Sequence, residues 1–152
     1  MRIIHVTRHG VDVASSLQTR SNKNWEEDES RFSKWLKMYR WKDSKSPIRR
    51  GQRAATLSHA FDFWSEHMEV EKKNLEECEF VLEVRYEDLL TTPKLAIKQI
   101  WNFIEIEGDD SLLEDISQSI DGSRAYAYKK DEEMKSFALE NRETLEIFGY
   151  LP

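Results

Sequence analysis

Arg8 and Ser16 are the side chains of this sequence whose type and spacing best suit chemistry, namely the binding of a phosphate group. Arg8 directly follows a run of β-branched residues, and Ser16 lies in a stretch that reads as a helix starting near Asp12. A guanidinium offers parallel N–H groups to a phosphate, and a serine hydroxyl donates one further hydrogen bond. A helix N-terminus adds free amides and a favourable dipole for an anion. The segment therefore predicts a site for a phosphate monoester.

The same residues also have a purely structural interpretation. Arg8 can pair with Asp12, and Ser16 can be an ordinary small helical residue, because many ion pairs serve structure alone. Asp12, Glu87 and Asp88 each stand at a predicted helix start, so we expect them to cap backbone amides rather than to act as a base. The surroundings of Arg8 must decide between the two interpretations.

Two strands and several helices are predicted to position these residues. β-branched and apolar runs indicate strands over residues 2–7 and 80–86. Apolar residues at helical spacing predict helices at about 57–68, 93–104 and 112–120, and one closing helix over 134–148. Residues 22–50 are expected to form a surface insertion with a short helix around Phe32 to Tyr39. Strands that alternate with helices favour an α/β fold with a short parallel sheet flanked by helices.

Composition limits the possible partners. The formal net charge of −6 argues against general nucleic-acid binding, which needs a basic face. No apolar run approaches the roughly 18 to 20 residues that cross a bilayer, and no signal peptide is evident. Cys78 is the single cysteine of the sequence and cannot form an internal disulfide, so we expect a cytoplasmic protein. His59 and His67 lack a third ligand, and we predict no metal site.

Two blocks of the sequence, taken in order, resemble the PAPS-dependent sulfotransferases (PAPS is 3′-phosphoadenosine 5′-phosphosulfate). The first is a hydrophobic strand followed by Arg, three residues, Asp-Val, two residues and Ser, which is similar to the family's 3′-phosphate segment. The second is the strand 80–84 with Arg85 to Leu89, Pro93 and the helix 97–103. The tail, with residues 123–126 and 148–150, is similar to the end of bacterial-type members.

The resemblance implies a role for five residues and a fold. Arg8 and Ser16 would hold the 3′-phosphate of PAPS or of its product, 3′-phosphoadenosine 5′-phosphate (PAP). Tyr86 would lie near the nucleotide, although it also suits an ordinary strand-end aromatic. Ser123 and Arg124 match a loop that closes over the nucleotide phosphate, although a loop arginine is often only solvated. The implied fold is an incomplete three-layer arrangement like that of P-loop NTPases.

The sequence lacks the Gly/Ser/Thr-rich loop that holds the 5′-phosphosulfate in this family, and it lacks the segment that carries the base. The isolated Gly51 does not follow a strand and is no phosphate loop. We therefore expect residues 1–152 to be a single domain, the C-terminal part of a sulfotransferase, that binds the nucleotide weakly and does not turn over.

Two functions remain open at this stage. The first is sulfuryl transfer from PAPS to a hydroxyl or amine acceptor. The second is a non-catalytic remnant that binds 3′-phosphoadenosine nucleotides or a protein partner, with self-association through an exposed sheet edge. A third possibility, a kinase-like P-loop protein, has the same architecture, but this sequence contains no phosphate loop to support it. Trp25, Trp35 and Trp41, beside several basic residues, fit either an acceptor cleft for a carbohydrate or a packed lid.

Overall fold

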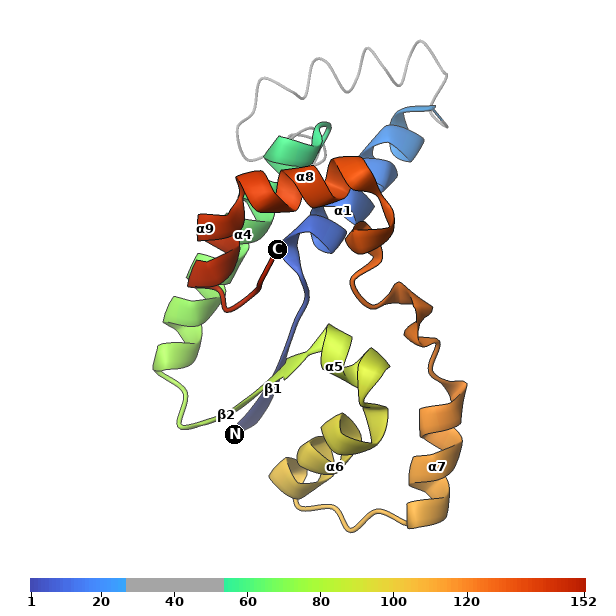
Figure 1. The fold of residues 1–152 in the computed structure, drawn as a ribbon. Helices are drawn as coiled ribbons and strands as arrows, with labels where there is room; N and C mark the ends of the chain where they lie inside the picture. The colour runs from blue at the N-terminus through green and yellow to red at the C-terminus, as the bar shows by residue number, and fades with distance from the viewer. Residues whose placement is uncertain (27–53) are drawn as a thin grey trace. The chain divides into compact units, whose positions relative to one another are not determined.

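The computed structural model describes residues 1–26 and 54–152, which are coloured in Figure 1. They divide into two compact units, one made of Met1–His9 and Val70–Pro152 and the other of the described part of Gly10–Glu69. The predicted helix around Phe32 to Tyr39, like Trp35 and Trp41, lies outside the described residues. No helix in the described ranges is long and apolar enough to cross a membrane.

The first unit contains a parallel pair of strands, β1 (Arg2–Thr7) and β2 (Phe80–Arg85). The register runs from Arg2 opposite Phe80 to Thr7 opposite Arg85, so both strands end at the same level. These bounds confirm both predicted strands. The α/β class with a short parallel sheet flanked by helices is confirmed as well (Figure 1).

Helices follow β2 along the rest of the first unit. They are α5 (Tyr86–Thr91), α6 (Pro93–Ile104), α7 (Asp110–Ser119), the 3-10 turns η1 (Gly122–Arg124) and η2 (Ala127–Lys130), α8 (Glu132–Glu140) and α9 (Arg142–Ile147). Pro93 is the first residue of α6, where its missing N–H costs nothing. α5 contains the helix start expected at Glu87 and Asp88, whereas Asn141 divides the expected closing helix into α8 and α9. α1 (Gly10–Glu26) also differs from prediction, because it runs into the range 22–50 expected to be a surface insertion.

The second unit is built on α1 (Gly10–Glu26) and the first part of α4 (Leu57–Glu76). Phe61 and Trp64 are buried, with ring centroids 5.2 Å apart. They lie so close to Gly10 that a Cβ there would come within 2.6 Å of the Trp64 ring and 2.8 Å of the Phe61 ring. A glycine at the start of α1 therefore permits the close approach of this buried aromatic pair.

Candidate functional site

Arg8 and Tyr86 leave the carboxyl ends of two neighbouring parallel strands. Thr7 and Arg85 form the last pair of the register, so Arg8 and Tyr86 are the next residue on each chain. The guanidinium carbon of Arg8 lies 4.8 Å from the centroid of the Tyr86 ring, and both side chains are half-buried. In open α/β sheets this edge is where ligands bind. The structure thus brings together two of the residues predicted from the sequence.

The residues that follow, His9 and Glu87, are joined by a buried hydrogen bond. The backbone N–H of His9 donates to Oε1 of Glu87 at 2.9 Å, and neither residue is exposed to solvent. Glu87 does stand in the first turn of α5, as predicted, but α5 has no side-chain cap at its start. The expectation that Glu87 caps this helix was wrong, because its carboxylate reaches across to the chain that leaves β1.

The imidazole of His9 is packed among three tyrosines. It stacks on Tyr128 with centroids 4.2 Å apart and meets Tyr150 and Tyr126 edge-on at 5.3 and 6.1 Å. Its Nε2 lies 3.1 Å from the carbonyl oxygen of Leu151. Since a carbonyl only accepts, Nε2 carries the proton. Packing on these rings and the bond to Leu151 hold the imidazole of His9 in place.

The segment Gly149–Leu151 is bound to the ends of both strands. The hydroxyl of Tyr150 donates to Thr7 Oγ1 at 2.9 Å, and Nη2 of Arg85 donates to the carbonyl oxygen of Gly149 at 2.7 Å. The Arg85 guanidinium also lies 5.1 Å from the Tyr150 ring centroid. Burial raises the pKa of Tyr150 far above its usual value, and the negative charge of Glu87 adds to this effect. Tyr150 is only 2% exposed, so its phenol is shielded from solvent.

Ser123 and Arg124 lie on the exposed turn η1, which contacts α5. Both the amide and the hydroxyl of Ser123 donate to the carboxylate of Asp121, each at 2.9 Å, and the Lys130 ammonium donates to the Ser123 carbonyl at 2.6 Å. The bonds from Ser123 lower the pKa of Asp121, and the charges of Arg124 and Lys130 contribute. These two residues share the unit that contains Arg8, on a turn whose geometry is fixed locally.

Ser16 lies in the other unit. It is half-buried in α1, one turn after Asp12, which is buried in the first turn of the helix. Residues four apart share a helix face, so Asp12 and Ser16 point to the same side of α1. Arg8 and Ser16 are thus carried by different units, joined by the short stretch through Gly10.

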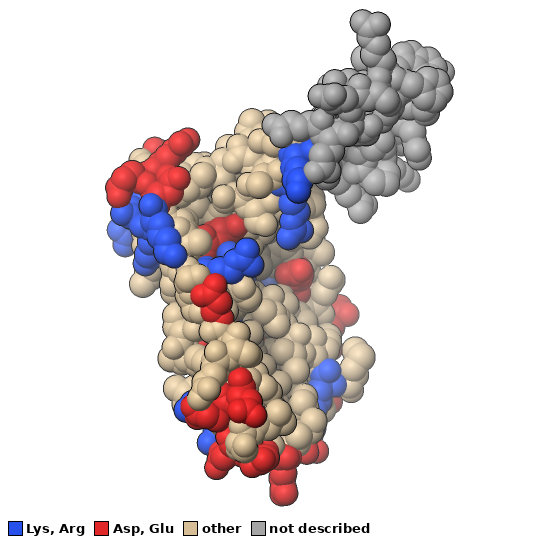
Figure 2. Space-filling view, turned by 90° about the vertical axis from the view of Figure 1, so that its right-hand side faces the viewer, with Lys and Arg blue, Asp and Glu red and all other residues tan. Residues whose placement is uncertain are grey.

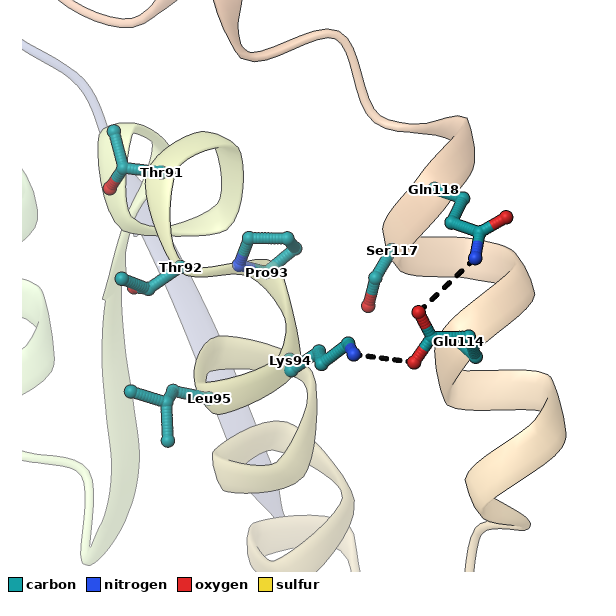
Figure 3. Close-up of a pocket in the computed structure, with 8 residues that line it drawn as sticks. All are labelled: Thr91, Thr92, Pro93, Lys94, Leu95, Glu114, Ser117 and Gln118. Carbon is teal, nitrogen blue, oxygen red and sulfur yellow. Dashed lines mark hydrogen bonds and ion pairs between the residues drawn. The ribbon is translucent and has the colours of Figure 1, made fainter.

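A hollow of about 430 Å³ lies between the start of α6 and α7 (Figure 3). It contains none of the residues predicted for the site, and its polar groups bind one another. Glu114 pairs with Lys94 and accepts from Gln118 at 3.1 Å, and these bonds lower its pKa. The hydroxyl of Ser117 donates to the carbonyl of Leu113 at 2.6 Å. We therefore assign no function to this hollow.

The surface distribution of charged side chains and the arrangement of possible metal ligands are both visible in the described residues. Figure 2 shows basic side chains interrupted by acidic ones, with acidic residues prevailing at the lower end, where Figure 1 places α6 and α7. Among residues 1–26 and 54–152, no group of three or more His, Cys, Asp or Glu side chains is arranged to hold a metal ion.

A family model of the sulfotransferase domain matches residues 1–146. The chain belongs to the sulfotransferase family. No curated protein and no solved structure matches it with statistical significance. The family match covers all five residues that the sequence predicted for nucleotide binding in this sulfotransferase, and it spans both compact units.

Sequence reasoning missed the groups that pack around His9, the residue after Arg8, in this sulfotransferase. Glu87 was taken for a helix cap, and Tyr126, Tyr128 and Tyr150 were not connected with His9. One signal was present: Tyr86 and Glu87 follow β2 as directly as Arg8 and His9 follow β1. Parallel strands that end at the same level bring such pairs together, so the contact follows once the register is known.

Proposed function

We propose that this sulfotransferase binds the 3′-phosphate of PAPS, or of its product PAP, with Arg8 as the principal ligand at the carboxyl edge of the sheet. The observation that carries the proposal is the Arg8 guanidinium at the end of β1, stacked 4.8 Å over the ring of Tyr86 at the end of β2. The location and the charge both suit an anionic group of a nucleotide.

The residues present fit this nucleotide. A guanidinium donates hydrogen bonds within its own plane, so stacking on an aromatic face leaves its edges able to bind phosphate oxygens. Tyr86 then orients the guanidinium, and the half-buried site strengthens the attraction. Ser16 on α1 and the turn of Ser123 and Arg124 are proposed to add further hydrogen bonds to the nucleotide.

We propose sulfuryl transfer to a hydroxyl or amine acceptor as the reaction that this binding serves. When bound, PAPS supplies the activated sulfuryl group. The residues of this chain hold the nucleotide and exclude water beside it, which positions the donor for in-line transfer. The sequence contains no Gly-rich phosphate loop, so we propose that a segment outside residues 1–152 binds the 5′-phosphosulfate and supplies the base. The isolated chain is expected to bind PAP without transferring sulfate.

Calorimetric titration with PAP, adenosine 5′-phosphate (AMP) and ATP tests the proposal. The wild-type chain is expected to prefer PAP to AMP, because AMP lacks the 3′-phosphate. Arg8→Ala is expected to weaken PAP binding by roughly 1.5 to 3 kcal/mol, the value of a charged hydrogen bond, while AMP binding stays nearly constant. Arg8→Lys keeps the charge and loses the paired geometry, so it should fall in between.

Arg142→Ala is the matched control, because Arg142 is exposed on α9 and carries the same charge. It should bind PAP like the wild type. The proposal is wrong if ATP or AMP binds as tightly as PAP, or if Arg8→Ala lowers PAP affinity no more than Arg142→Ala does.

A further inference from the structure

Glu87 is an ionisable side chain in a place where charge is costly. It has no exposed surface, and removing a carboxylate from water costs several kcal/mol unless it is hydrogen-bonded or paired. A neutral side chain would fill the same space without that cost. The exposed carboxylate of Glu83, on the neighbouring strand β2, has no such cost. Glu87 therefore calls for a specific explanation.

The hydrogen bond of Glu87 fixes the backbone of Arg8. The donor is the N–H of His9 at 2.9 Å, and this N–H belongs to the peptide unit that joins Arg8 to His9. A peptide unit is planar, so holding its N–H also fixes the adjacent backbone torsion of Arg8. The direction in which the Arg8 side chain leaves the backbone is set accordingly.

Two consecutive residues after β2 thus hold two consecutive residues after β1. Tyr86 contacts the guanidinium of Arg8 through its ring, and Glu87 binds the next backbone amide. The last pair of the ladder, Thr7 with Arg85, stands immediately before them. Burial raises the pKa of both Tyr150 and Tyr126, and a negative charge on Glu87 raises them further.

We propose that Glu87 is the positioning residue that aims Arg8 at the 3′-phosphate, through the backbone amide of His9. This inference rests on the proposed function, since it concerns the same nucleotide site. Glu87 does not touch the nucleotide. It acts by accepting the hydrogen bond of the His9 amide, so the position of its oxygen atom decides its effect on Arg8.

Substitutions that separate oxygen position from charge test this assignment. Glu87→Gln keeps a carbonyl oxygen at nearly the same place and loses the charge. Glu87→Asp keeps the charge but is shorter by one C–C bond, about 1.5 Å, which takes the oxygen outside the usual hydrogen-bond range of about 2.7 to 3.2 Å. Glu87→Ala removes the acceptor, and Glu83→Ala removes an exposed carboxylate of the same charge as a control.

The measured quantity is the ratio of the dissociation constants for AMP and PAP. Loss of folded protein lowers the apparent affinity for AMP and for PAP by the same factor, so the ratio stays constant. A misdirected Arg8 weakens PAP binding alone and lowers the ratio. Glu87→Asp and Glu87→Ala are expected to lower the ratio about tenfold, as loss of one hydrogen bond would. Glu87→Gln should stay within about threefold of the wild type, because an amide oxygen still accepts. Glu83→Ala should leave the ratio unchanged.

The outcomes discriminate between the two proposals. If the wild type shows no preference for PAP, or Arg8→Ala retains it, the proposed function is wrong. If Arg8→Ala abolishes the preference while Glu87→Asp retains it, the nucleotide site stands and the positioning role of Glu87 is overturned. Loss in Glu87→Gln equal to that in Glu87→Asp also overturns it, because Gln keeps an acceptor oxygen at nearly the same place. If Glu87→Ala does not fold, the Gln and Asp variants decide the question by themselves.

Discussion

Tyr150→Phe removes one buried hydrogen bond and one titratable group at the end of the sheet. The lost bond is that from the Tyr150 hydroxyl to Thr7 Oγ1 at 2.9 Å, and Thr7 is only 3% exposed. A neutral hydrogen bond contributes about 1 kcal/mol, and a buried hydroxyl left without its partner costs about 1 to 3 kcal/mol. At pH 7 we therefore expect Tyr150→Phe to lower the free energy of unfolding by about 1 to 2 kcal/mol.

The difference between the two proteins is expected to shrink in alkali. Burial raises the pKa of Tyr150 in the folded state above its value in the unfolded chain. The resulting stabilisation is complete below the unfolded pKa of about 10 and is lost as pH rises, because the unfolded chain releases a proton that the folded chain retains. Between about pH 9 and 11 this linkage removes about 1.4 kcal/mol from the wild type alone. Near pH 11 both proteins should be almost equally stable.

Urea unfolding followed by far-UV circular dichroism, at pH 7, 9 and 11, measures this change. Tyr126, whose pKa burial also raises, is present in both proteins and cancels in the comparison. This prediction is refuted if the difference in free energy of unfolding between the wild type and Tyr150→Phe stays the same from pH 7 to 11. The folded state would then hold the Tyr150 proton no more firmly than the unfolded chain does.

Two further substitutions test local packing and capping. Gly10→Ala should destabilise the protein by about 1 to 3 kcal/mol, because the new Cβ overlaps the Trp64 ring; thermal unfolding measures this, and an unchanged melting temperature would contradict the packing described. Asp131→Ala removes the side chain that accepts from the amides of Glu133 and Met134 at the start of α8, and should cost about 1 kcal/mol. Asp131→Asn should keep most of the wild-type free energy of unfolding in the same urea titration. An Asn variant as unstable as the Ala variant would argue against a cap.

The strands and most helices were predictable because their signals are local. β-branched residues specify β1, and Pro93 with the apolar face after it specifies α6. The extents of the shorter helices were not predictable in the same way. α5 has six residues and α9 has six, lengths at which helix formation depends on tertiary contacts rather than on propensity. The break at Asn141 has no proline or glycine to announce it.

The candidate site was predictable in part. Arg8 and Tyr86 each follow a recognisable strand, and parallel pairing brings both to one edge. The groups around them could not be deduced, since His9 meets Leu151 across a sequence separation of 142 residues. A buried carboxylate such as Glu87 also looks like any helix-start acid in a sequence, because its burial depends on elements that come from elsewhere in the chain.

The bond between Thr7 and Tyr150 joins residues 143 positions apart. During synthesis β1 therefore leaves the ribosome long before the residues that complete its carboxyl end. Contacts between distant residues slow folding, because loop closure must precede them. The turn that carries Arg8 consequently reaches its final form only after translation of nearly all of this sequence, because the residues that bind the ends of β1 and β2 are synthesised last.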